Sequence, residues 1–417
     1  MSRASAELEA ALKRFETLYP EKIDLSLERI YILLDRLGRP QDQLPPVIHV
    51  AGTNGKGSTC AFMRAMAEAA GLNVHVAISP HLVRFNERIR LAGKLVEDEA
   101  LIAWLDRVYD AVGPGGQITH FEAAMAAAFL AFSEVSADLL ILETGLGGRY
   151  DASNMVDHPA VSVLTPIDYD HKTYLGTDLS RIAWEKAGII KAGCPVVSAA
   201  QNFIPAGVIA EEAFALNAPL TVLTPADIAS APQQRALIGQ HQAQNAALAA
   251  KALEVWGDPR IAKSAIEHGA AQAVWPARMQ KLGDGPLTQT ASFAEVWLDG
   301  GHNPHAARAV ADVLGRMPGH TVLVCAMMAN KDALGFFASF SALDAPVFTC
   351  PNAEGHNGAA PEDLAIAARK AGLQAKACVS LDSALVQAEE SGADRVLICG
   401  SLYLAGDVLA RNDQTPI

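Results

Sequence analysis

The sequence predicts an α/β protein with a P-loop-type, doubly wound, mostly parallel sheet followed by a smaller Rossmann-like α/β domain. Three observations lead to this prediction. A glycine-rich turn within 50–59 follows a short apolar run and precedes a helix-like segment. Short β-branched runs then alternate with alanine-rich amphipathic stretches, which is typical of a parallel sheet with crossover helices. After a turn-rich break at 282–286, the same alternation begins again.

The elements of the first domain follow from periodicity. Helical spacing over residues 5–37 predicts two helices before the first strand. The expected strands are the short runs at 47–50, 74–78, 139–142, 161–164 and 196–198. The expected helices include 59–70, 101–112, 121–132, 242–255 and 261–271.

The alternation restarts in the last third of the chain. The strands expected there are 296–298, 321–325, 347–349 and 395–399, and the helices are 306–316, 361–371 and 382–390. Because turn residues gather at 282–286, we place the domain boundary there. The chain is thus divided into a nucleotide-binding domain at 1–285, which includes the N-terminal helices, and a domain of ordinary size at 286–417.

The composition is that of a compact globular protein. Half of the 417 residues are hydrophobic, and the formal net charge of −13 argues against nucleic acid or an anionic membrane as a partner. The six cysteines are scattered without a C-x-x-C pair, as is typical of reduced core thiols in a cytoplasmic protein. Glu7 and Glu9 argue against a signal peptide, and the longest apolar stretch, near 123–132, is too short to span a bilayer.

The segment 50–59 is the most informative in the chain. A strand, a glycine-rich turn and a helix together hold a nucleotide phosphate, because backbone N–H groups and the helix N-terminus converge on phosphate oxygens. Lys56 would then reach the β- and γ-phosphates, and Ser58 would place its hydroxyl on Mg²⁺. One residue separates this lysine from this serine, unlike in the general G-x-x-x-x-G-K-[ST] pattern. The alternative is an ordinary glycine-rich turn.

Two other strand ends carry polar residues. Glu143 stands where a buried strand runs into the glycines before Arg149. Ligands bind at this carboxyl end in open α/β sheets, and an acid there suits Mg²⁺, while an arginine could meet an anion. Ser79, followed by Pro80 and His81, supplies an oxygen ligand at a second strand end, with arginines after it. The alternatives are a helix-capping acid and a polar loop with solvated arginines.

Further candidates are weaker when each is taken alone. His171 follows a strand, where a structural histidine is the commoner role. Lys186 stands in a helical segment, where a solvated surface lysine is the default. Asn245 and Asp299 lie in segments that could simply cap helices, since Asn and Asp favour such positions.

Taken together, these segments resemble the folylpolyglutamate synthase and dihydrofolate synthase family of the Mur ligase superfamily. The resemblance runs in order over nearly the whole chain. The matching segments are 22–25 with 27–29, 51–58, 79–85, 143–149 with Asp151, 170–171, 185–189, 278–280 and 299–305. Gly301 stands where an alanine is usual, and Ala277 stands where a glycine is usual.

The resemblance implies an ATP-dependent amide ligase with ATP and two Mg²⁺ ions as cofactors. ATP would phosphorylate a substrate carboxylate, and the amino group of L-glutamate would attack the acyl phosphate, releasing phosphate. The implied substrates are dihydropteroate, which gives dihydrofolate, and reduced folates, which give folylpolyglutamates. Catalysis would depend on positioning and on charge neutralisation, without a protein nucleophile.

The resemblance also assigns roles to residues. The catalytic residues would be Lys56, His171 and Lys186. The nucleotide would be held by Thr53, Asn54, Gly55, Lys56, Gly57, Ser58, Asn245, Arg278 and Asp299. The first Mg²⁺ would be bound by Ser58, Ser79 and Glu143, and the second by His171 with Lys186, which matches a lysine that the superfamily carries as a carbamate. The substrates would contact Pro80, His81, Arg84, Thr119, Phe121, Arg149 and Asp151.

Three other classes of protein remain as alternatives. A cell-wall Mur ligase carries an extra N-terminal domain for a uridine nucleotide, and only 46 residues precede Val47. A nucleotide-binding switch or regulatory ATPase would not need the segment at Asp299. A non-enzymatic relative would not need the intact Lys56 and Lys186 set. Within the family, the enzyme could be a folylpolyglutamate synthase only; we favour both activities, and we expect a monomer.

Overall fold

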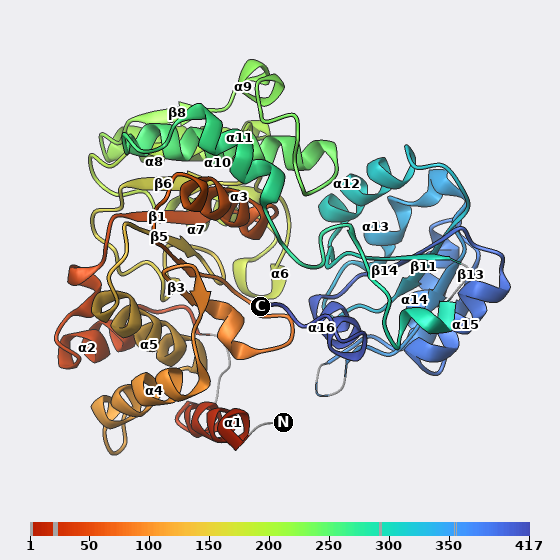
Figure 1. The fold of residues 1–417 in the computed structure, drawn as a ribbon, viewed down its shortest axis with the longest axis horizontal. Helices are drawn as coiled ribbons and strands as arrows, with labels where there is room; N and C mark the ends of the chain where they lie inside the picture. The colour runs from red at the N-terminus through yellow and green to blue at the C-terminus, as the bar shows by residue number, and fades with distance from the viewer. Residues whose placement is uncertain (1–2, 20–23, 292–293, 354, 356) are drawn as a thin grey trace. The chain divides into compact units, whose positions relative to one another are not determined.

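The computed structural model describes residues 3–19, 24–291, 294–353, 355 and 357–417. Residues 22–23 of the matching N-terminal segment lie outside this part. The chain packs into two compact units (Figure 1). The first comprises the described residues of Met1–His81, Asn86–Arg235 and Ala243–Ala273, and the second comprises those of Leu82–Phe85, Ala236–Gln242 and Val274–Ile417.

The first unit contains an eight-stranded sheet in the order β4-β3-β2-β5-β1-β6-β7-β8. Its strands are β1 (Val47–Ala51), β2 (Val74–Ala77), β3 (Ile89–Leu91), β4 (Lys94–Leu95), β5 (Leu139–Glu143), β6 (Val161–Leu164), β7 (Val196–Ser198) and β8 (Leu220–Val222). The six strands from β2 to β8 in this order are parallel, and the β3–β4 hairpin adds an antiparallel edge. The predicted doubly wound α/β fold is confirmed.

The helices of the first unit lie on both faces of this sheet. They are α1 (Arg3–Glu16), α2 (Glu28–Arg36), η1 (Pro40–Gln43), α3 (Lys56–Ala69), η2 (Phe85–Arg88), α4 (Asp98–Val112), α5 (His120–Glu134), α6 (Lys172–Leu175), α7 (Leu179–Ala187), α8 (Phe203–Ala215), α9 (Pro225–Ala229), α10 (Gln240–Trp256) and α11 (Lys263–Gln272). Helix α3 packs on β1, β2 and β5 and is covered by α11. Helices α4 and α5 lie on the other side of these strands (Figure 1).

The second unit contains a six-stranded sheet in the order β13-β12-β11-β14-β10-β9. Its strands are β9 (Gln280–Lys281), β10 (Glu295–Leu298), β11 (Thr321–Cys325), β12 (Val347–Thr349), β13 (Ala375–Ala377) and β14 (Arg395–Cys399). All are parallel except β9, which pairs antiparallel with β10. Its helices are α12 (Pro304–Leu314), α13 (Ala333–Ala338), α14 (Pro361–Lys370), α15 (Leu381–Glu390) and α16 (Leu402–Arg411), with η3 (Thr288–Ala291) and η4 (Ser341–Leu343).

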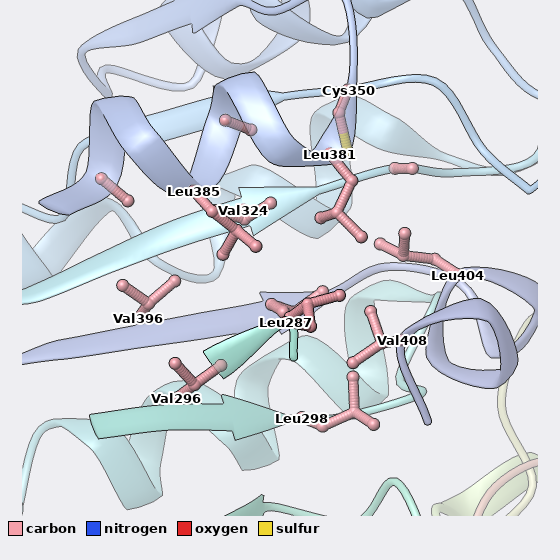
Figure 2. Packing of buried hydrophobic residues seen from close by; sticks show 14 of the residues in the cluster. Leu287, Val296, Leu298, Val324, Cys350, Leu381, Leu385, Val396, Leu404 and Val408 are labelled. Carbon is pink, nitrogen blue, oxygen red and sulfur yellow. The ribbon is translucent and has the colours of Figure 1, made fainter. Parts of the chain in front are cut away.

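Both faces of the second sheet are buried. On one face Val324 and Val396 pack against Leu385 of α15 and Val408 of α16 (Figure 2). On the other face, side chains of β11 and β14 pack against α12, α13 and α14. Since strands buried on both sides read as continuous apolar runs, this explains why the four runs expected in this unit were recognisable.

Three further sequence expectations concern the domain boundary, the cysteines and membrane-spanning segments. Strand β9 already pairs within the second sheet, and the second unit takes up the chain again at Val274. The division of the chain into domains at 1–285 and 286–417 stays a prediction. The six cysteines are buried and free, as expected. Across the described residues, no helix combines the length and the apolar character needed to cross a membrane.

Candidate active site

The glycine-rich turn lies between the end of β1 at Ala51 and the start of α3 at Lys56. Gly52 and Gly55 have φ angles of 147° and 89°, in the left-handed region that favours glycine. A Cβ atom on Gly52 would lie 1.9 Å from Thr165 Oγ1, and one on Gly55 would lie 2.5 Å from Asn245 Oδ1. The turn therefore needs both glycines, and Asn245 of α10 lies against Gly55.

Lys56 folds back over this turn. Its Nζ donates hydrogen bonds to the carbonyl oxygens of Gly52 (3.2 Å) and Thr53 (3.4 Å). Ser58, two residues further into α3, is buried at 2% exposure. The α3 N-terminus and the Lys56 ammonium bring positive charge to this turn, as in sites that bind phosphate.

Lys186 reaches the same turn from α7. It is 5% exposed, and its Nζ donates a hydrogen bond to the Gly52 carbonyl oxygen at 3.0 Å. Burial is the main reason that the pKa of Lys186 falls to about 7, and the Lys56 charge lowers it further, while Asp170 and Asp151 oppose the shift. Lys186 is thus not a solvated surface lysine. Both effects favour the uncharged amine over the ammonium at this position.

Glu143 and Ser79 meet at the carboxyl edge of the sheet, beside the turn. Val50 pairs with Glu143 in the register of β1 and β5, and Ser79 N donates to Glu143 Oε2 at 3.4 Å. Ser79 Oγ is buried without a hydrogen-bond partner, although such groups rarely stay unpaired. A carboxylate and an unpaired hydroxyl fit a hard cation that takes its remaining ligands from phosphates and water. Across the described residues, no group of three or more His, Cys, Asp or Glu side chains lies together in a way that could hold a metal.

The segment around His171 contacts the glycine-rich turn at 52–55, which we call the phosphate turn. Thr53 Oγ1 donates to the Asp168 carbonyl oxygen (2.8 Å) and accepts from Asp168 N (3.0 Å). His171 has a φ of 50°, and its backbone N–H donates to Asp170 Oδ1 at 2.7 Å. These contacts hold the segment after β6 beside the turn, and the Asp170 charge acts on Lys186. A role for the His171 ring in holding a metal stays a prediction.

Arg149 and Asp151, two of the expected substrate contacts, make several contacts within the protein. The Arg149 guanidinium forms an ion pair with Glu212 (2.5 Å) and lies 3.9 Å above the Trp184 ring. Asp151 is 2% exposed and accepts hydrogen bonds from Leu146 N, Ser153 N and Ser153 Oγ. Burial raises the pKa of the Asp151 carboxyl.

Thr119 and Phe121 lie at the start of α5. Thr119 caps this helix in a reciprocal pair with Glu122, and the Phe121 ring lies against Gly145, where a Cβ atom would come within 2.5 Å of it. Glu122 also forms an ion pair with Arg29 at 3.1 Å. The ring expected to seat a pterin therefore touches the loop that follows Glu143.

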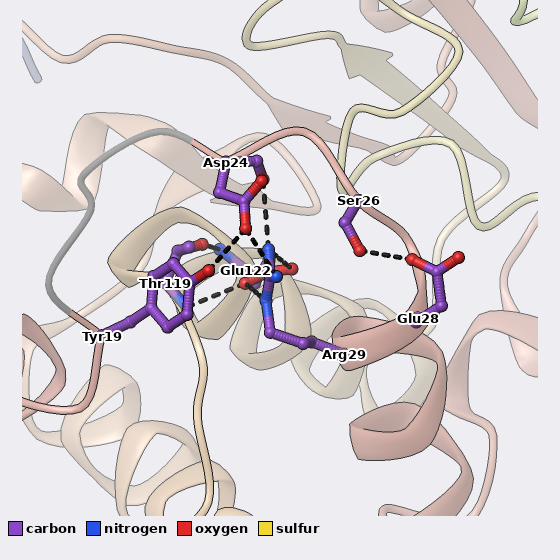
Figure 3. Close-up of polar contacts among 7 residues, drawn as sticks. All are labelled: Tyr19, Asp24, Ser26, Glu28, Arg29, Thr119 and Glu122. Carbon is purple, nitrogen blue, oxygen red and sulfur yellow. Dashed lines mark hydrogen bonds and ion pairs between the residues drawn. The ribbon is translucent and has the colours of Figure 1, made fainter.

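Sequence reasoning gave no role to Arg29. It donates to Asp24 at 2.8 Å and to Glu122, and its guanidinium stacks 4.7 Å above the Tyr19 ring (Figure 3). The Thr-x-x-Glu spacing at 119–122 was the available signal for the Glu122 cap, since it is the pattern of a capping box. No sequence signal pairs Arg29 with a residue in a helix so distant along the chain.

Pro80, His81 and Arg84 follow Ser79 in the chain. His81 accepts a hydrogen bond at Nδ1 from Arg88 Nε (2.8 Å), next to Pro80. Arg84 belongs to Leu82–Phe85, which packs with the second unit.

In the second unit, Asp299 accepts from Met279 N (2.9 Å) and Gly301 N (2.7 Å), and Arg278 lies beside Gly300. The charges of Asp299, Arg278 and His305 all act on His241, whose pKa is lowered mainly by burial. Sequence reasoning gave His241 and His305 no role.

A cavity of about 900 Å³ lies between α9, α10 and α11. Its lining includes Lys251, Glu254 and His268, and none of the predicted site residues. The phosphate turn, and not this cavity, is where the chemically matched groups gather.

Relatives of this chain are known in sequence and in structure. Residues 277–402 match the family described as Mur ligase, glutamate ligase domain. The chain is 33% identical to the dihydrofolate synthase/folylpolyglutamate synthase of Escherichia coli (strain K12), over 98% of this chain and 96% of that protein. It is 36% identical to the Bacillus subtilis (strain 168) protein of the same name, over 73% and 76%.

Two solved structures extend the similarity to the fold. E. coli FolC in complex with DHPP and ADP superposes with a TM-score of 0.85 at 32% identity, covering 99% of each chain. A bifunctional folylpolyglutamate synthase/dihydrofolate synthase with Mn, AMPPNP and L-glutamate bound gives a TM-score of 0.83 at 31% identity, covering 98% of each chain.

Proposed function

The chain belongs to the dihydrofolate synthase/folylpolyglutamate synthase family, and on that premise we propose that it joins L-glutamate to dihydropteroate and to reduced folates. It is an ATP-dependent ligase that uses a divalent metal. The observation that carries the assignment is the convergence of Lys56 and Lys186 on the Gly52 carbonyl oxygen, at a glycine-dependent phosphate turn. A simple nucleotide switch needs the first lysine but has no use for the second.

The reaction makes an amide from a carboxylate, which requires activation. A carboxylate oxygen of the pteroate or folate attacks the γ-phosphorus of ATP, the bond from that phosphorus to the bridging oxygen breaks, and ADP leaves. The glutamate nitrogen then attacks the acyl carbon, phosphate leaves, and the nitrogen loses a proton. Lys56, the turn N–H groups and the α3 N-terminus neutralise charge on the phosphoryl group, which is the main contribution a protein makes to such transfer.

Two Mg²⁺ ions would serve this chemistry. Ser58, Ser79 and Glu143 would hold the first, and His171 with a carbamate on Lys186 would hold the second. Bound there, the ions supply positive charge that offsets the charge of the phosphates. The unpaired, buried Ser79 Oγ supports the first site, because a cation is the kind of partner it lacks.

A carbamate on Lys186 suits the position of this lysine. An ammonium there would repel both Lys56 and a metal. The uncharged amine instead attacks CO₂, an N–C bond forms, and a proton is released, so that a cation becomes an anion with two oxygen donors. Its burial, its proximity to the phosphate turn and its pKa near 7 support this modification.

The other site residues follow the family pattern. Asn245, Arg278 and Asp299 would contact ATP, and Thr119 and Phe121 would seat the pterin. Pro80, His81 and Arg84 would contact the rest of the substrate. The contact between Phe121 and Gly145 supports a pterin pocket beside the Glu143 loop. We further expect a cytoplasmic monomer without nucleic-acid or membrane partners.

An ADP-release assay with three substrate pairs tests the function. We expect turnover with dihydropteroate plus L-glutamate and with a reduced folate plus L-glutamate, and none with a UDP-linked muramyl substrate. Turnover with the reduced folate alone would leave a folylpolyglutamate synthase only and remove the claim of two activities. Turnover only with the muramyl substrate would indicate another Mur-type amino-acid ligase.

A further inference from the structure

We propose that Arg149 is a positioning residue that fixes the C-terminal end of α7, and with it Lys186, against the loop that follows Glu143. This role replaces the substrate contact expected for Arg149. It rests on the proposed function insofar as Lys186 is taken to act as a carbamate. The loop at 144–149 and helices α7 and α8 all lie in the first unit.

The backbone of the loop is packed directly on the last turn of α7. Arg149 N donates to the Glu185 carbonyl oxygen at 2.7 Å. A Cβ atom on Gly148 would lie 2.7 Å from that same oxygen and 3.1 Å from Lys186 Cα, and one on Gly188 would lie 2.3 Å from Arg149 Cβ. Two glycines are therefore needed for the loop and the helix end to approach this closely.

The Arg149 side chain completes the same contact. The last four carbonyl groups of a helix have no partner within it. Arg149 Nη2 donates to the Trp184 carbonyl oxygen at 3.3 Å, so this one residue serves two of the four carbonyls at the end of α7. Asn154 Nδ2 adds a bridge between the carbonyl oxygens of Arg149 (3.0 Å) and Gly188 (3.1 Å).

The guanidinium is enclosed by the protein's own groups. It stacks 3.9 Å above the Trp184 ring and is paired with Glu212 of α8 at 2.5 Å. The side chains of Arg149 and Glu212 are each only about one-fifth exposed. Arg149 Nε is buried without a hydrogen-bond partner. The charge of Arg149 is thus already matched by a partly buried carboxylate of the protein, and removing either partner would leave the other partly buried and unpaired, which is unfavourable.

The contacts of Arg149 also fix the position of Lys186, because they hold the residue before it in the short helix α7. Lys186 is the next residue after Glu185, whose carbonyl oxygen Arg149 holds, and its Nζ lies 3.0 Å from the Gly52 carbonyl oxygen. Glu143, at the other end of the same loop, is the expected metal ligand. A displacement of a catalytic group by about 1 Å can cost roughly 10²-fold in rate. The Arg149 contacts, which hold Lys186 and Glu143 in position relative to each other, therefore affect turnover.

The experiment compares Arg149→Ala, Glu212→Gln and the control Arg181→Ala on exposed α7 surface. ADP release is measured in CO₂-depleted buffer with added bicarbonate, at saturating ATP, folate and glutamate. We expect Arg149→Ala to lower kcat at least ten-fold and to raise the half-saturating bicarbonate concentration at least five-fold, with the KM values for folate and glutamate unchanged. Glu212→Gln should shift both quantities in the same direction, and Arg181→Ala should shift neither.

Two further measurements keep the test decisive. Thermal unfolding identifies a variant that has lost its fold, and Arg149→Lys, which keeps the charge but cannot stack and bridge as a guanidinium does, should fall between wild type and Arg149→Ala. An unchanged bicarbonate requirement in folded Arg149→Ala, or a raised KM for a substrate, overturns the positioning role. A gain in substrate affinity in Glu212→Gln would likewise show that Arg149 binds an anion. If wild type needs no bicarbonate at all, the carbamate in the proposed function fails first, and this role fails with it.

Discussion

The Nζ atoms of Lys56 and Lys186 donate hydrogen bonds to one acceptor, the carbonyl oxygen of Gly52, at 3.2 and 3.0 Å. One amine comes from the first turn of α3 and the other from the last turn of α7. Burial and the Lys56 charge bring the pKa of Lys186 to about 7. In the proposed function the two lysines have different uses: Lys56 would neutralise a phosphate, and Lys186 would react as a free amine.

The first prediction concerns the Lys56 ammonium. Lys56→Ala should lower kcat by roughly 10²-fold or more, because it removes a cation that would face the transferred phosphoryl group. The fold should persist, since the Nζ contacts only two carbonyl oxygens of the turn. The measurement is steady-state ADP release together with thermal unfolding. Lys94→Ala, on an exposed lysine of β4, is the matched control; near-normal turnover of folded Lys56→Ala would mean that the turn is misassigned.

The second prediction uses the unpaired Ser79 hydroxyl. Ser79→Ala should raise the Mg²⁺ concentration for half-maximal activity by roughly ten-fold. Its metal-free melting temperature should not fall, because the buried Oγ has no hydrogen bond to lose. The control is Ser133→Ala, whose Oγ does donate to the Leu130 carbonyl oxygen and whose Mg²⁺ requirement should stay at the wild-type value. A lowered melting temperature with an unchanged Mg²⁺ requirement would assign Ser79 a structural role.

The third prediction concerns pH and stability. His49 is fully buried in β1, and burial, aided by the Lys191 charge, lowers its pKa from 6.5 to about 3. Between these values the unfolded chain binds the proton and the folded one does not, so the free energy of unfolding falls as the pH falls below 6.5. At pH 5 the loss from this group amounts to roughly 2 kcal/mol.

Urea unfolding of wild type and His49→Gln at pH 7 and pH 5 checks this. The variant should lose roughly 2 kcal/mol less than wild type between the two pH values, since glutamine does not titrate. His49 lies outside the proposed metal and nucleotide contacts, and its Nε2 contacts Ser153 Oγ at 3.0 Å. Equal losses in the two proteins would show that His49 is protonated in the folded state as readily as in the unfolded chain.

The sequence predicted the parts of the fold and site that depend on local pattern. Buried strands such as β1 and β5 read as continuous apolar runs, and their carboxyl ends meet at one sheet edge, which is why Glu143 could be expected near the phosphate turn. Short edge strands such as β8 and the β3–β4 hairpin lack that signal and were not predicted. The pairing of Arg149 with Glu212 could not be predicted from the sequence, because it depends on how α7 and α8 pack. A polar residue in a glycine-rich loop looks the same whether it braces the loop or faces a ligand.

The last prediction concerns the sign of the charge at Lys186. Lys186→Ala should lose about 10²-fold in kcat, because it removes the anion proposed to support the second metal. Short carboxylates such as acetate or formate should partly restore activity by occupying the vacated position with the same charge and the same oxygen donors. Lys186→Arg should not restore it, since a guanidinium stays positive and does not form a carbamate under these conditions. The assay is ADP release in buffer with and without bicarbonate. Full activity of Lys186→Arg in CO₂-depleted buffer would show that a cation suffices at this position, and the carbamate would then be wrong.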